Sequence, residues 1–174
     1  VVDSQLDGER LRQARQRNPF GISDRDIDAI RRELHDIEGL TAWKQLKADV
    51  SRDRIRLDSA AVLGISGDFE KVVNFAVGQG RFLNERDALE HRRVCVLGAA
   101  IAEAIGIAES PLGESLVIGD QPFVVVGVMQ NRPFTASTVK DVNIVNRNQD
   151  VYIPYSALAR YFPRIQRAGV YDAI

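Results

Sequence analysis

The stretch RVCVLGAAIAEAIG, residues 93–106, has the order of strand, glycine turn and helix with which many nucleotide-binding domains begin. A dinucleotide fingerprint needs three glycines spaced G-x-G-x-x-G, and a phosphate loop needs G-x-x-x-x-G-K followed by serine or threonine. Neither pattern is present, because Gly98 is followed by alanines. Small alanines suit close packing of a helix on a strand, so we expect Gly98 to be architectural and no cofactor to be bound.

Four residues that can bind metals or transfer protons lie close together at Glu85, Asp87, Glu90 and His91. They could form a metal site or an acid–base pair, or they could be a charged, solvated edge. Metal ligands must converge on one point, and nothing in the spacing E-x-D-x-x-E-H forces that convergence in a loop. The only other histidine, His35, lies among charges and leaves a zinc site without an obvious third ligand. We expect the solvated edge and no metal.

Ser66 and Cys95 are the candidates for nucleophilic catalysis. A nucleophile elbow requires G-x-S-x-G, but Asp68 stands where the second glycine belongs. Cys95 alternates with Val94 and Val96 in a predicted strand, where a lone cysteine is more often a small hydrophobic residue than a reactive thiol. We therefore expect no catalytic residue and interpret the chain as a domain that is not an enzyme.

The composition sets outer limits on the function. The chain has 174 residues, 45% of them hydrophobic, which is enough for one sizeable core. Basic residues number 23 and acidic residues 24, so no overall field favours nucleic acid. A single cysteine excludes an internal disulfide, and no apolar stretch is long enough to cross a bilayer. The chain begins at Val1 and its only methionine is Met129, which indicates a mature or excised piece.

The first forty residues are predicted to hold a leader and a helix. Residues 1–20 form a basic leader, which we interpret as a solvated, partly helical tether or as a segment close to lipid headgroups. Its arginines are Arg10, Arg12, Arg15 and Arg17. Residues 23–39 predict an amphipathic helix, because Ser23 is a good N-cap and Gly39 a good end. Its apolar face consists of Ile27, Ile30, Leu34 and Ile37.

A predicted hairpin follows the helix. Residues 40–50 and 54–66 alternate apolar and polar side chains on either side of the charged break SRDR, which is typical of two strands joined by a turn. Residues 67–75 carry the signal of one or two helical turns. Gly78 and Gly80 then permit a turn that other residues resist.

A second α/β unit is predicted in the next part of the chain. Residues 92–98 predict a buried strand and residues 99–106 a helix, followed by two strands around a turn at Gly119. Residues 150–162 predict a strand, a proline and a short helix. The last six residues, 169–174, are typical of a strand that is just beginning.

The segment 131–149 is polar, rich in asparagine and long for a connection within a compact domain. Long loops are often kept for binding. The aromatic and basic side chains of this segment suit a transient contact with a partner, and they are Arg132, Phe134, Lys140 and Arg147. We predict a partner surface here, with an ordinary solvated loop as the alternative.

Short motifs of this chain follow a recognisable order. They are GIS at 64–66, Phe69, GRF at 80–82, Leu97-Gly98, PLG at 111–113, Pro122-Phe123, VGV at 126–128 and Ile153-Pro154. In this order they resemble the MacB-like periplasmic core domain of ABC-transporter permeases, over about two thirds of the chain. The resemblance carries over no catalytic residue.

The resemblance implies an extracytoplasmic domain, tethered between the first two spans of a permease in the bacterial inner membrane. It would couple ATP hydrolysis on a cytoplasmic domain to export or mechanical work through contacts with a partner or substrate. The implied partners are the permease helices, the ATPase domain and, where present, an adaptor of the membrane-fusion type, with a homodimer only in the full transporter. The alternatives are a small soluble α/β nucleotide-binding enzyme and a free-standing periplasmic scaffold.

The resemblance also implies an α+β fold with two lobes. Residues 1–20 would be a juxtamembrane leader. Residues 21–66 and 151–174 would form a βαβ-containing membrane-proximal lobe, and residues 67–150 a distal α/β lobe inserted in it. The return segment is expected to be incomplete at Ile174, because the family continues through a strand and a helix to the next span. Drugs, peptides, toxins and lipoproteins are cargoes of the family, and the sequence does not choose among them.

Overall fold

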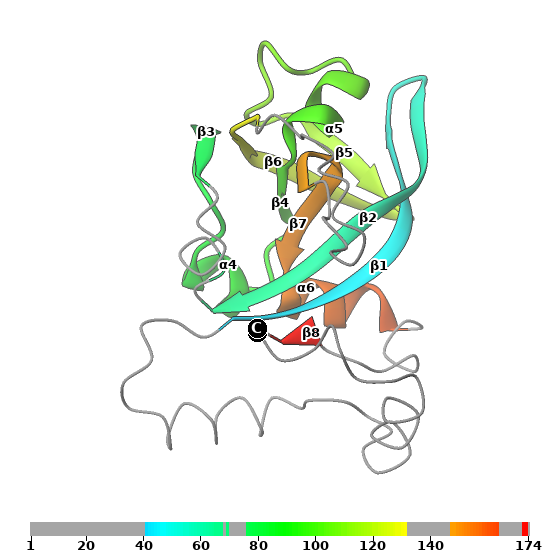
Figure 1. The fold of residues 1–174 in the computed structure, drawn as a ribbon. Helices are drawn as coiled ribbons and strands as arrows, with labels where there is room; N and C mark the ends of the chain where they lie inside the picture. The colour runs from blue at the N-terminus through cyan, green and yellow to red at the C-terminus, as the bar shows by residue number, and fades with distance from the viewer. Residues whose placement is uncertain (1–40, 68, 70–75, 132–146, 164–171, 174) are drawn as a thin grey trace, which may run out of the picture.

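The computed structural model describes residues 41–67, 69, 76–131, 147–163 and 172–173 (Figure 1). Strands and short helices make up this part of the chain, as expected for a mixed α/β fold. The predicted leader at 1–20 and the predicted helix at 23–39 lie outside the described residues. Most of the predicted helical turns at 67–75 lie outside them as well.

A long antiparallel hairpin dominates the sheet. β1 (Thr41–Arg52) pairs with β2 (Ile55–Gly67), and the turn falls at Asp53, within the charged break that the sequence indicated. The register shifts between Ala48 and Val50, where Asp58 and Ser59 of β2 lie opposite Asp49 alone, which places a bulge on β2. Within this bulge Ser59 adopts φ 54° and donates its backbone N–H to Asp49 Oδ1 at 3.0 Å. The bulge thus has its own hydrogen bond.

Six strands close into a ring. The strands after the hairpin are β3 (Val77–Gly80), β4 (Val94–Leu97), β5 (Ser115–Ile118), β6 (Gln121–Met129), β7 (Asp150–Pro154) and β8 (Asp172–Ala173). The order β2-β7-β4-β6-β5-β1 returns to its start, because β1 pairs with β2 and also with β5. β7 runs parallel to β2 and antiparallel to β4. β3 pairs with β6, and β8 pairs with the beginning of β1.

Short helices lie at the two ends of this ring. They are α4 (Glu85–Leu89), α5 (Ala99–Ala104) and α6 (Tyr155–Tyr161), with a 3-10 turn η1 (Arg147–Gln149) before β7. In Figure 1, α4 and α6 lie at the end where β1 begins, and α5 lies at the opposite end with the hairpin turn. α6 packs closely on β2, because a Cβ at Gly64 would overlap Leu158.

The interior consists of two buried clusters. The larger one joins the ring strands to α5 and α6, and includes Leu97, Ile105, Phe123 and Leu158. The smaller one is aromatic: the ring of Phe69 lies 6.1 Å from that of Trp43, 6.2 Å from that of Phe82 and 5.5 Å from that of Tyr152, centroid to centroid. Such edge and offset contacts add to the stabilisation from burial alone. Residues from β1, β7 and the loop after β3 therefore meet in one cluster.

Most of the predicted elements are confirmed. The strand before Gly98, the helix after it, the two strands around Gly119 and the strand–proline–helix at 150–162 are all present. The sequence missed β3 and α4. The division into a proximal and an inserted lobe stays a prediction. Strands of both proposed segments share one sheet, because β1 pairs with β5 and β7 pairs with β4.

Candidate functional site

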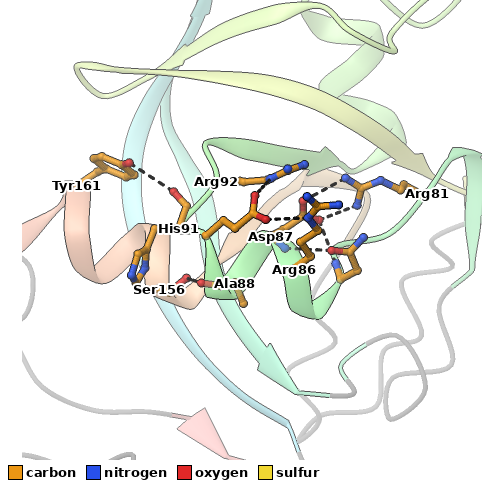
Figure 2. Close-up of polar contacts among 10 residues, drawn as sticks. Arg81, Arg86, Asp87, Ala88, His91, Arg92, Ser156 and Tyr161 are labelled. Atoms are coloured by element: carbon orange, nitrogen blue, oxygen red, sulfur yellow. Dashed lines mark hydrogen bonds and ion pairs between the residues drawn. The ribbon is translucent and has the colours of Figure 1, made fainter.

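Asp87, one of the four clustered residues that were expected to form a solvated edge, is fully buried in α4 and holds a structural ion pair (Figure 2). Its carboxylate accepts from Arg81 Nη1 at 2.6 Å and from Arg81 Nη2 at 3.1 Å. It also accepts the backbone N–H of Asn84, whose side chain caps the helix through the N–H of Asp87. Burial would raise the pKa of Asp87, but the hydrogen bonds from Arg81 and Asn84 lower it overall. Asp87 thus stays ionised and orders this loop.

The other three members of the group do not converge with Asp87. Glu90 accepts hydrogen bonds from Arg86 at 2.7 Å and from Arg92 at 2.6 Å, and these bonds lower the pKa of Glu90. Glu85 is exposed. His91 has φ 49°. Among the described residues no three His, Cys, Asp or Glu side chains could share a metal ion. The expectation of a charged, solvated edge is wrong for Asp87, because a partner outside the motif, Arg81, lets it be buried.

Helix α6 is joined to this region through two hydroxyl groups. Ser156 Oγ donates to the backbone carbonyl of Ala88 at 2.6 Å, and the hydroxyl of Tyr161 donates to that of His91 at 3.4 Å (Figure 2). The guanidinium of Arg93 lies 5.4 Å from the ring centroid of Tyr161. These contacts link elements that are about 70 residues apart in sequence and make the α4 region a structural junction.

The candidate nucleophiles and the glycine turn occupy structural positions. Cys95 is completely buried in β4, and burial raises the pKa of its thiol, so the reactive thiolate is disfavoured. Ser66 lies in β2. The backbone N–H of Gly98 donates to the carbonyl of Asp150 at 2.8 Å and is therefore not available to a phosphate. A Cβ at Gly98 would overlap the carbonyl of Asn148. His35 lies outside the described residues.

Arg147, predicted as part of a partner surface, packs within the chain. Its guanidinium carbon lies 5.8 Å from the ring centroid of Trp43 and 5.6 Å from that of Phe69. Such contacts between a cation and an aromatic face are favourable and fix the planar guanidinium. The hydroxyl of Tyr152 donates to the Arg147 backbone carbonyl at 3.3 Å. Arg132, Phe134 and Lys140, the other predicted contact residues, lie outside the described residues.

Asp150 is a buried carboxylate that the sequence-based search missed. Its side chain is at the start of β7, and the residue is only 3% exposed. The hydroxyl of Tyr152 lies 3.5 Å from its Oδ2, and it shares its single hydrogen between this oxygen and the backbone carbonyl of Arg147. Burial raises the pKa of Asp150 to about 6, although Arg147 and Tyr152 act in the other direction. The signal in the sequence was an aspartate at the head of an otherwise apolar strand, DVYIP.

Two open cavities flank α5. One of about 500 Å³ lies between α5 and the hairpin and is lined by Gln45, Leu57, Asp58, Ser59, Ala60, Ala61, Ala100, Ile101, Ala104, Gln149 and Asp150. The other, of about 430 Å³, lies between α5 and the β3–β6 edge and includes Gln79, Glu103 and Gln130 in its lining. Both volumes are in the range of small-molecule sites. Neither holds the paired groups of a nucleophile and a base.

The fold is one found outside the membrane in bacterial transporters. The structure of the periplasmic region of MacB from Actinobacillus actinomycetemcomitans is similar with a TM-score of 0.70 and 22% identity, covering 87% of this chain and 63% of that one. The extracellular domain of YknZ, a noncanonic ABC-type transporter from Gram-positive bacteria, is similar with a TM-score of 0.68 and 21% identity. The match covers 86% of this chain and 71% of that one. The chain therefore has the fold of these two domains.

The chain belongs to the MacB-like periplasmic core domain family, whose model matches residues 2–171. This confirms the family that the ordered motifs indicated. It makes the chain a periplasmic-side domain of a MacB-like ABC-transporter permease. Within the part of the chain that the structure describes, no helix has the length and apolar character to span a membrane.

Curated relatives are export proteins that are several times longer. The macrolide export ATP-binding/permease protein MacB 2 of Aeromonas hydrophila is 27% identical over 138 residues, which are 79% of this chain and 20% of that protein. The MacB of Wolinella succinogenes is 31% identical over 121 residues, 69% and 18% of the two chains. The pyoverdine export protein PvdT of Pseudomonas aeruginosa is 32% identical over 98 residues, 56% and 14%. The chain spans about a fifth or less of these relatives.

Proposed function

We propose that this domain couples ATP hydrolysis on a separate cytoplasmic domain to export or mechanical work outside the membrane, by contacting a partner or the cargo. The observation that carries the proposal is the family match over residues 2–171. The names of the relatives support it, because they are ATP-binding/permease proteins for export of macrolides or pyoverdine. The domain would act by binding and movement and would have no catalytic centre of its own.

Its partners would be the transmembrane helices and ATPase domain of the same transporter, with a membrane-fusion adaptor where the system has one. The proposed contact surface is the polar segment 132–146. Arg147 and Asn148 are left out of it, since Arg147 packs over Trp43 and Asn148 lies against Gly98. This narrows the surface predicted from the sequence.

The location can be tested by cysteine labelling in the full transporter. Leu89 is 72% exposed, so a thiol in Leu89→Cys should react with a membrane-impermeant maleimide added to spheroplasts. The native Cys95 is buried and should give no background. Leu97→Cys, at a fully buried position, is the matched control and should stay unlabelled. Labelling of Leu89→Cys only after lysis would place the domain on the cytoplasmic side and reject the proposal.

The coupling can be tested by shortening the segment 132–146 in the full transporter. We expect export to fall while ATP hydrolysis and membrane insertion persist, because the ring of strands is formed by other residues. Glu85→Ala changes an exposed side chain elsewhere and serves as the control, with export unchanged. Normal export by a correctly inserted, shortened transporter would show that this segment is not needed for coupling.

A further inference from the structure

The lining of the cavity between α5 and the hairpin combines acidic residues with small apolar ones. Asp150 and Asp58 both line it, and among the described residues no Lys, Arg or His does. Its walls are mostly alanine, with Ala60 and Ala61 from β2 and Ala100 and Ala104 from α5. Short side chains on both walls leave the space open. Gln45, Ser59 and Gln149 add groups that can form hydrogen bonds.

The two aspartates differ in how far their charge is already compensated. Asp58 accepts from Arg56 Nε at 2.9 Å, and Arg56 also pairs with Asp49. Asp150 has no salt bridge among the described residues. Arg147 acts on Asp150 only through its electrostatic field, since its guanidinium lies over the rings of Trp43 and Phe69. Asp150 therefore provides a negative charge in the lining that has no ion-pair partner among the described residues.

A buried carboxylate with so few partners is unfavourable in an unliganded domain. Desolvation raises its pKa, and the hydrogen bond from Tyr152 is long, at 3.5 Å, and shared with the carbonyl of Arg147. The cost falls when a cation with hydrogen-bond donors enters the cavity and pairs with the carboxylate. A metal ion fits less well, because alanine walls offer it no ligands and the described residues contain no three-residue chelating group.

We propose that this cavity binds organic cations, with a protonated amine on Asp150 and the apolar body of the ligand against the alanines of β2 and α5. The volume of about 500 Å³ accommodates a ligand of that kind. The site belongs to the isolated chain, so it can be tested without reference to transport. Failure of the coupling proposal would leave this proposal standing, and the reverse also holds.

Three small probes of matched shape separate charge from shape. They are 2-phenylethylammonium, its neutral analogue 2-phenylethanol and the anion 3-phenylpropanoate, added to the 174-residue chain and followed by amide chemical shifts in NMR. We expect saturable shifts at Ala61, Ala100 and Asp150 with the ammonium probe. The affinity for the alcohol and for the anion should be lower by a factor of about ten or more. Equal affinity for all three, or no saturable shift at these residues, would overturn the proposal.

The pH dependence has a definite sign. The titratable and charged groups around Asp150 are Tyr152 on its own strand, Arg147 of η1 and Asp58 of β2, while Glu103 of α5 lines the other cavity. Because protonated Asp150 no longer attracts a cation, affinity for 2-phenylethylammonium should fall between about pH 7.5 and about pH 5. Affinity for the alcohol should not change over that range. Parallel behaviour of the two probes would contradict the assigned charge.

Two variants and a control complete the test. Asp150→Asn should abolish the preference for the ammonium probe over the alcohol, and Asp58→Asn, which alters an exposed carboxylate of the same cavity, should keep it. Ala104→Leu places a larger side chain in the lining from an exposed helix position and should weaken binding of both probes. If Asp150→Asn does not fold, Ala104→Leu and the pH profile decide. Wild-type selectivity in folded Asp150→Asn, or unchanged binding in Ala104→Leu, rejects the site.

Discussion

At the scale of single residues, Asp87 and Asp150 are two buried carboxylates whose pKa values are shifted in opposite directions. Asp87 receives two bonds from Arg81 and one from the backbone of Asn84, and its pKa is lowered. Asp150 receives one long bond from Tyr152, and its pKa is raised to about 6. The first arrangement is typical of a structural ion pair. A buried carboxylate with a raised pKa, such as Asp150, is more typical of a ligand-binding site.

Asp87→Ala should destabilise the domain, because it leaves Arg81 without its partner and removes one half of the capping box. We expect the free energy of unfolding to fall by about 2 kcal/mol, less than for a fully buried pair since Arg81 is partly solvated. Urea denaturation measures this, with exposed Glu85→Ala as the control within about 0.5 kcal/mol of the wild type. Because the folded-state pKa of Asp87 is lowered, its contribution is present above the unfolded pKa and is lost as the pH falls below it. An equal loss in both variants would show that the buried pair has no special role.

Asp150→Asn should have the opposite effect on stability. The folded-state pKa of about 6 exceeds the unfolded value, so at neutral pH the ionised carboxylate costs the folded state free energy, at most about 3 kcal/mol. Asparagine removes that cost, so we expect the variant to be more stable than the wild type near pH 7.5. The gain should shrink as the pH falls below the folded-state pKa of about 6, and it should vanish only below the unfolded pKa of about 4, where Asp150 is protonated in both states. Denaturation over this pH range measures the difference, and a gain that is independent of pH would contradict the assignment.

The burial of Asp87 could not be predicted from its own motif. The spacing E-x-D-x-x-E-H shows only that charges are dense, whereas the residue that allows burial, Arg81, precedes the motif and approaches it through a turn at Gly80 with φ 77°. Gly98 is the reverse case. Its architectural role followed from the absence of a phosphate motif, and the structure places the carbonyl of Asn148 where a side chain would begin. A local sequence pattern can thus exclude a phosphate site, but it does not show which distant residue a side chain contacts in the fold.

At the scale of elements, alternation predicted the strands that bury one face. β5 and the first half of β6 alternate exposed and buried residues, and both were predicted. β3 was missed because four residues, two of them glycine, cannot show a period, and three of the four are exposed. α4 was missed because its five residues are mostly charged and depend on the Asn84 cap. Elements held by caps and by single partner strands have no periodic signal.

The contact between α5 and η1 gives a prediction for Gly98→Ala. Its Cβ would overlap the Asn148 carbonyl, and backbone cannot move aside as a side chain can, so the free energy of unfolding should fall by about 2 kcal/mol or more. Gly113→Ala is the contrast: φ is 85°, but nothing lies within 4 Å of the new Cβ. There we expect about 1 kcal/mol, from backbone strain alone. Chemical denaturation of both variants decides, and a harmless Gly98→Ala would mean that η1 packs less tightly on the turn.

At the scale of the whole molecule, the closed order of strands could not be predicted from the sequence. Each of the six ring strands was predicted from its own pattern, but nothing local states that β7 lies between β2 and β4, or that β1 pairs with both β2 and β5. The family was nevertheless indicated by motifs that lie at strand ends and turns, such as Gly80, Gly98 and Pro154. These positions are restricted by backbone geometry, which explains why they are informative when side-chain periodicity is not.

The whole domain should neither bind nor hydrolyse ATP. The one strand–glycine–helix turn lacks a lysine, and the N–H of Gly98 is bonded to the carbonyl of Asp150. Calorimetry of the 174-residue chain with magnesium and ATP should give no heat of binding, whereas the full transporter should bind through its separate ATPase domain. Micromolar affinity in the isolated chain would favour the nucleotide-binding alternative.

The position of β7 also constrains how the domain is made. β7 holds residues 150–154, yet it lies between β2, which ends at residue 67, and β4. Until those residues emerge during synthesis, β2 and β4 each present an unpaired edge, and the ring cannot close. Pairing over such sequence separations is slow, and exposed strand edges invite aggregation. In the nascent domain these two edges therefore stay exposed until β7 has been translated.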